Sequence, residues 1–99
     1  MSGYGTEISF RLGPGTLDEA RAIAVRLAAA AAGCRRHVLF VDADAGEYGC
    51  LAEWDDRAAA VAFRGRPAVR AALDALEARL GNAPRVRLYA MEESPPGPP

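Results

Sequence analysis

The stretch Glu47-Tyr-Gly-Cys-Leu-Ala-Glu-Trp54, followed by Asp55-Asp56-Arg-Ala-Ala-Ala60, decides the fold, because two-residue alternation gives way here to a helical repeat. Alternation places one set of side chains on one face of a strand, namely Tyr48, Cys50, Ala52 and Trp54. The opposite face carries Gly49, Leu51 and Glu53. Asp55 or Asp56 has the side chain of a helix N-cap. The stretch therefore predicts a central strand that leads directly into a helix.

The rest of the chain predicts three more strands and two helical regions. Residues 36–42 pair with 47–54 as a hairpin across a short polar loop, and residues 7–12 and 85–91 alternate as further strands. Thr16 and Glu19 form a potential capping box for a helix over 17–32, which Gly33 ends. The second helical region covers 56–64, breaks at Gly65-Arg-Pro67, and continues to residue 80.

The element order βαββαβ predicts an α+β, ferredoxin-like fold, in which a four-stranded antiparallel sheet carries two helices on one face. The domain is predicted over residues 1–93, and the Pro-rich residues 94–99 are predicted to be a disordered tail. Both faces of the predicted hairpin carry apolar groups, because Val38, Phe40 and Leu51 lie on the face opposite Tyr48, Cys50 and Trp54, and one face of the sheet has no helix to cover it. Because an apolar sheet face needs a partner, we expect a homodimer closed sheet to sheet.

Composition narrows the partners and the compartment. A net charge of -1 and a pI near 5.8 argue against binding to nucleic acid, whose phosphates normally require a basic patch. No apolar run is long enough for a membrane span, and we expect neither a signal peptide nor a membrane partner, so the cytoplasm is the expected compartment. The hairpin register separates Cys34 and Cys50 by roughly 17 Å, which predicts free thiols.

The chain resembles the antibiotic biosynthesis monooxygenase family over about residues 6–92. The resemblance lies in the order and spacing of Pro14-Gly15, Gly46-Glu-Tyr48, Trp54 with the acidic pair after it, Ala59, and Pro67. It implies a dimeric α/β barrel. Members of this family include cofactor-independent oxygenases of aromatic polyketides and quinols, haem-degrading enzymes, and proteins without known chemistry.

Two departures from the family pattern bear on cofactors. Many quinol-oxygenase-like relatives carry a His where this chain has Phe63, and the haem-associated positions read Phe63, Leu73 and Ile8. The single His and two distant cysteines do not make a zinc site, and Gly46-Glu47 breaks the pattern of a calcium loop. We therefore expect no cofactor and no metal.

The candidate catalytic residues are His37 and Arg70. His37 shares a predicted strand face with Tyr48, Cys50 and Trp54, although the residue alone fits a partly exposed structural position better than a functional one. Arg64, Arg66 and Arg70 surround the helix break and could clamp an anionic substrate, or simply cover solvated helix faces. The candidate binding residues for an aromatic small molecule are Tyr48, Cys50, Trp54 and Phe63.

The resemblance implies a cofactor-independent monooxygenase acting on an aromatic polyketide or a quinol. The missing family His keeps open a non-catalytic dimer that binds a small ligand, and the fold also suits non-oxidative chemistry such as isomerisation or cyclisation. RNA recognition uses the same element order, but residues 47–54 lack the basic and stacking pattern that it needs.

Overall fold

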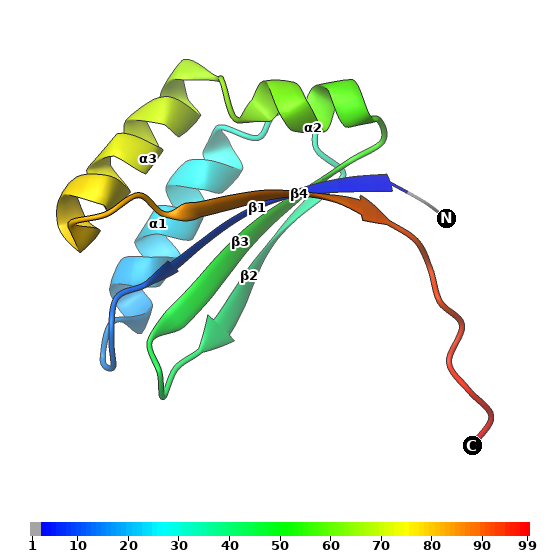
Figure 1. Cartoon of the computed structure of the whole chain (residues 1–99), viewed down its shortest axis with the longest axis horizontal. Coiled ribbons are helices and arrows are strands. Elements are labelled where there is room, and N and C mark those ends of the chain that lie inside the picture. The colour runs from blue at the N-terminus through cyan, green and yellow to red at the C-terminus, as the bar shows by residue number, and fades with distance from the viewer. Residues whose placement is uncertain (1–2) are drawn as a thin grey trace.

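The computed structural model describes residues 3–99 and confirms the ferredoxin-like prediction. The elements in order are β1 (Gly3–Arg11), α1 (Leu17–Ala29), β2 (Arg36–Asp42), β3 (Glu47–Trp54), α2 (Arg57–Phe63), α3 (Pro67–Leu80) and β4 (Arg85–Met91). The strands form one antiparallel sheet in the order β2-β3-β1-β4. The helices lie together on one side of that sheet (Figure 1).

The sheet register decides which side chains enter the core. Cys50 lies opposite Leu39 on β2, as predicted, and opposite Ile8 on β1. The face under the helices carries the alternating set Tyr48, Cys50, Ala52 and Trp54, which the sequence had grouped on one strand face. Its buried members pack with apolar positions of all three helices, and the resulting core includes Ile8, Phe10, Ala20, Leu27, Tyr48, Cys50, Trp54, Ala60, Phe63, Val69 and Leu76.

Three helix boundaries and caps test the local predictions. Asp56 is the N-cap of α2, where its Oδ1 accepts a hydrogen bond from the Ala59 N–H at 2.8 Å. Arg66 has extended backbone before Pro67, which begins α3, so the predicted break is confirmed. The predicted capping box at Thr16 is wrong, because its hydroxyl donates to the Gly13 carbonyl at 2.6 Å and makes no bond to the helix.

Two predicted ends also move. The first strand begins at Gly3 instead of residue 7, because Gly3 still pairs with Met91 on β4. Helix α1 ends at Ala29 instead of residue 32, because the chain tightens into a turn in which the Ala31 N–H bonds to the Ala28 carbonyl. Long-range pairing sets the first boundary and a local turn sets the second.

Gly46 joins the β2–β3 turn to the end of β1. Its carbonyl accepts hydrogen bonds from the N–H groups of Leu12, at 2.8 Å, and Gly13, at 3.3 Å. Its φ is +67°, and a Cβ there would lie 1.8 Å from the Gly13 carbonyl oxygen. Only glycine fits this crossing without moving the backbone.

Cys34 and Cys50 are free thiols, as predicted. Residues 92–99, which include the predicted tail, are exposed and have no regular secondary structure, while Met1 and Ser2 of the predicted domain lie outside the described residues. Within residues 3–99, no helix is both long enough and apolar enough to cross a membrane.

Candidate functional site

An aromatic pair lies at the centre of the core, where β3 meets α2. Alternation along β3 points Trp54 under the helices, and Phe63 comes from the last position of α2. Their ring centroids are 5.2 Å apart with planes tilted by 47°, and each side chain is 1% exposed. The structure thus brings together two of the predicted binding residues, in a centre closed to bulk solvent.

The indole N–H of Trp54 has no acceptor. Among residues 3–99, Trp54 Nε1 is the one buried side-chain nitrogen or oxygen atom that has no hydrogen-bond partner. Most buried polar groups in proteins are paired, because an unpaired one loses its hydration without compensation. The neighbouring Thr6 hydroxyl, by contrast, donates to the Ala60 carbonyl at 2.8 Å. The indole N–H is therefore a donor that a ligand oxygen could satisfy.

Arg66 covers this centre from the helix break. Its guanidinium carbon lies 5.1 Å from the Trp54 ring centroid and 5.8 Å from that of Phe63. Its Nη1 donates to the carbonyls of Ala30 and Ala32, both at 2.9 Å. The side chain is thus directed into the protein, whereas the sequence had left open a clamp for an anion or a solvated helix face.

His37 and Cys50 lie on the same sheet face as Trp54, as the hairpin register predicted. His37 is half-buried opposite Ala52, and burial lowers its pKa, so the imidazole is neutral at pH 7 and can accept a proton. Burial raises the pKa of the Cys50 thiol to about 12. Cys50 is therefore a protonated, apolar wall of the core and no nucleophile at neutral pH.

Tyr48 lies at the far end of β3 from Trp54. Its hydroxyl is 2.9 Å from the Thr16 hydroxyl, and its ring centroid is 5.7 Å from that of Phe10. The sequence placed Tyr48 on the correct face, but it gave no sign of the contact with Thr16, which joins the loop before α1 to the sheet.

Arg70 lies apart from these residues. It is exposed on α3 and borders a hollow of about 200 Å³ with Leu73, Asp74, Glu77, Ala83 and Pro84. The structure does not bring it together with the strand residues of the predicted site, and its role stays a prediction.

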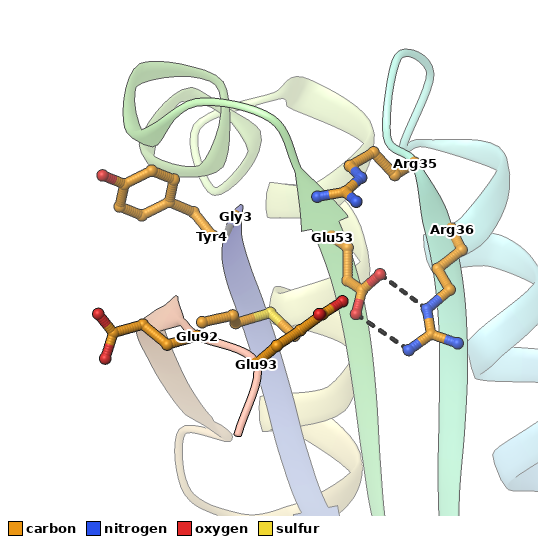
Figure 2. Close-up of a pocket in the computed structure, with 8 residues that line it drawn as sticks. Gly3, Tyr4, Arg35, Arg36, Glu53, Glu92 and Glu93 are labelled. Atoms are coloured by element: carbon orange, nitrogen blue, oxygen red, sulfur yellow. Dashed lines mark hydrogen bonds and ion pairs between the residues drawn. The ribbon is translucent and has the colours of Figure 1, made fainter. Parts of the chain in front are cut away.

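A larger pocket of about 440 Å³ opens at the end of the sheet where the chain leaves β4. It is lined by Gly3, Tyr4, Arg35, Arg36, Glu53, Met91, Glu92 and Glu93. Figure 2 shows Arg36 and Glu53 facing each other across β2 and β3, while Glu92 points away from that pair. Arg36 donates to both carboxylate oxygens of Glu53, at 2.7 and 3.1 Å.

Sequence reasoning missed this pocket. The alternation did place Glu53 on the strand face opposite Tyr48, Cys50 and Trp54, and in the register Arg36 lies directly across from it. The hydrogen bonds from Arg36 hold the pKa of the Glu53 carboxyl below its usual range, against the opposing effect of burial. The remaining walls come from the start of β1 and the end of β4, whose meeting is set by the sheet order alone.

Over the described part of the chain, no three His, Cys, Asp or Glu residues are grouped so that they could hold a metal ion. What the centre offers is an unpaired N–H donor, aromatic walls and a neutral imidazole on the adjoining strand.

Residues 5–75 match the family described as antibiotic biosynthesis monooxygenase. The chain belongs to the antibiotic biosynthesis monooxygenase family. The match runs from β1 into α3 and contains the whole aromatic centre of this family member. It leaves out Gly3, Tyr4 and residues 91–93 of the pocket in Figure 2. A search of curated proteins finds no match.

Solved structures share the fold of this antibiotic biosynthesis monooxygenase family member. Rv0793 from Mycobacterium tuberculosis is 21% identical with a TM-score of 0.72, covering 93% of this chain and 97% of that one. SnoaB, a cofactor-independent oxygenase from Streptomyces nogalater, is 20% identical with a TM-score of 0.67, covering 99% and 98%. A conserved protein from Methanosarcina mazei is 14% identical with a TM-score of 0.72, covering 93% and 95%. At these identities the likeness extends to the fold alone.

Proposed function

We propose that this chain is a cofactor-independent monooxygenase that oxidises a quinol or a phenolic polyketide. The observation that carries the proposal is the unpaired Trp54 Nε1–H, buried among aromatic side chains in a chain of the antibiotic biosynthesis monooxygenase family. A donor held ready in an apolar centre stabilises negative charge far better than a donor in water does.

The proposed reaction takes all its electrons from the substrate. Neutral His37 accepts the phenolic proton, and the resulting phenolate delivers electrons to molecular oxygen. A ring carbon conjugated to the phenolate forms a bond to one oxygen atom, while two hydrogens of the substrate leave with the second oxygen atom as water, so that the product is a quinone. The indole N–H of Trp54 stabilises the negative charge on oxygen during this transfer. Phe63 and the protonated Cys50 provide walls that exclude water.

Oxygen uptake tests the proposal. Wild-type protein is incubated with a panel of dihydroxynaphthalene-type quinols and phenolic polyketides, without flavin or metal and with a chelator present. We expect protein-dependent oxygen consumption that falls in His37→Gln and in Trp54→Phe, which removes the indole N–H while keeping an aromatic ring. A wild-type protein that binds these compounds and consumes no oxygen contradicts the proposal.

A second candidate function is ligand binding without oxidation. It is favoured by the closed packing of Trp54 and Phe63, each 1% exposed, because a planar substrate needs those side chains to move. The pocket of about 440 Å³ in Figure 2 already has the size of a small-molecule site. Its charged walls suit a polar ligand better than an aromatic polyketide. Binding that is lost in Glu53→Gln but retained in Trp54→Phe favours this candidate.

We also propose that the protein acts as a homodimer. The sheet face opposite the helices has no covering element in Figure 1, and it carries Phe40, 50% exposed, and Tyr89, 36% exposed. Leu51 and Met91 fill the space above Gly5 on the same face, where an added Cβ would lie 2.7 Å and 3.0 Å from their side-chain atoms. Val38 lies beside Leu51 in the register, so β2, β3 and β4 all present apolar side chains on this face to a second copy. Charged groups on the same face are paired within the chain, since Tyr89 donates to Glu7 at 3.1 Å and Arg36 to Glu53 at 2.7 Å.

A further inference from the structure

The break between α2 and α3 aims Arg66 at the end of α1. Because Pro67 follows, Arg66 has extended backbone, with φ -62° and ψ 137°, instead of continuing the helix. This geometry sends the side chain across to Ala30 and Ala32, thirty-odd residues earlier in the chain. Ala30 is the C-cap of α1. Carbonyls at a helix C-terminus lack helical partners and carry partial negative charge, so they attract a cation.

The same guanidinium restrains the aromatic centre. Its carbon is 5.1 Å from the centroid of Trp54, a distance at which a cation is attracted to an aromatic face. Phe63 packs against the indole as well, with ring centroids 5.2 Å apart. The two carbonyl bonds fix the guanidinium, and the guanidinium and Phe63 together fix the plane of the indole.

Arginine can do this without consuming the indole donor. A guanidinium has N–H donors only and cannot accept a hydrogen bond, so it holds the ring while Nε1–H stays unpaired. Both carbonyl bonds come from Nη1, which leaves the rest of the delocalised guanidinium beside the two rings. An ammonium group is compact and strongly hydrated, so one placed between the carbonyls would not extend over the indole in the same way. The position thus favours the planar group of arginine.

We infer that Arg66 is the positioning residue of this site, and that it holds the Trp54 indole so that its N–H faces the oxygen of a bound ligand. The inference rests on the proposed function for its consequence in turnover. The break between α2 and α3 thereby takes part in the function, which neither the family match nor the alternation of β3 indicates.

The indole can be observed without any ligand, because Trp54 is the chain's single tryptophan. Arg66→Met and Arg66→Lys are compared with Arg57→Gln, which removes an exposed arginine at the start of α2. All of these variants are measured under conditions in which circular dichroism shows that they are folded. Relative to wild type, we expect the single indole N–H resonance to shift and broaden in both Arg66 variants, and its hydrogen exchange with solvent to quicken. Arg57→Gln should show neither change. A simple loss of stability would not move this resonance in protein that remains folded.

Turnover gives the second readout. With a quinol that wild type oxidises, we expect kcat to fall by about tenfold or more in Arg66→Met and Arg66→Lys, because a displaced donor loses its alignment. An unchanged indole resonance in both variants overturns the inference. If the resonance changes but wild type consumes no oxygen, the proposed function fails and the positioning of the indole by Arg66 stands.

Discussion

Arg66 lies over the indole of Trp54, with 5.1 Å between the guanidinium carbon and the ring centroid, while its Nη1 bonds to two carbonyls at the end of α1. One side chain therefore connects the helix break, the first helix and the last residue of β3. The orientation of Trp54, the largest fully buried side chain among residues 3–99, depends on residues that are far apart in the sequence.

Trp54 should separate stability from function when two substitutions are compared. Trp54→Ala empties the centre of the core and should lower the free energy of unfolding by about 3–5 kcal/mol. Trp54→Phe should cost less, because it keeps most of the ring and removes a donor that has no partner. Urea unfolding measures both. Equal losses in the two variants would mean that the indole N–H is satisfied in solution.

Gly46 should be far less tolerant of a side chain than Gly81. Both have positive φ, +67° and +81°, but only at Gly46 does an added Cβ meet backbone, 1.8 Å from the Gly13 carbonyl oxygen. We expect Gly81→Ala to lower the free energy of unfolding by about 1–2 kcal/mol, and Gly46→Ala by about 3 kcal/mol or more. Thermal unfolding of the pair checks this. A similar loss in both would show that the turn moves away from β1 at little cost.

His37 should make the fold less stable as the solution becomes acidic. Burial lowers its pKa from the usual 6.5, so below that pH the unfolded chain binds the proton more readily than the folded chain does. Stability is therefore full above pH 6.5 and is lost as pH falls towards the folded-state pKa. We expect urea midpoints between about pH 7.5 and about pH 5 to fall less in His37→Gln than in wild type. If the urea midpoints of the two proteins fall by the same amount over this pH range, His37 is exposed to solvent and burial does not lower its pKa.

Phe40 should control association if the uncovered sheet face is the dimer interface. Phe40→Glu places a charge on that face and should convert a homodimer into a monomer in sedimentation equilibrium at micromolar concentration. Val25→Glu is the matched control, because Val25 is 68% exposed on α1. It should leave association unchanged. A wild-type protein that sediments as a monomer, or dissociation by the control alone, would contradict the proposed interface.

Several features could be predicted from the sequence because they depend on neighbouring residues. Alternation in residues 47–54 gave the strand, its core-facing side chains and the end at Trp54, and Asp56 marked the start of α2. The pairing of Leu39 with Cys50 followed from the short loop between two alternating segments. Together with the element order, these local signals were sufficient for the ferredoxin-like fold and for the family.

The tertiary structure alone decided how the polar groups are used. Thr16 sits in a local pattern that suggests a helix cap, and Arg66 in one that suggests an anion clamp or a solvated helix face. In the folded chain the Thr16 hydroxyl instead contacts that of Tyr48, and Arg66 bonds to the end of α1, because these partners are distant in the sequence and close only in the tertiary structure. The pocket around Glu53 likewise depends on β1 and β4 meeting at one end of the sheet. Periodicity fixes which face a side chain takes, since that is a property of the local backbone, whereas its partner is fixed by contacts between distant segments.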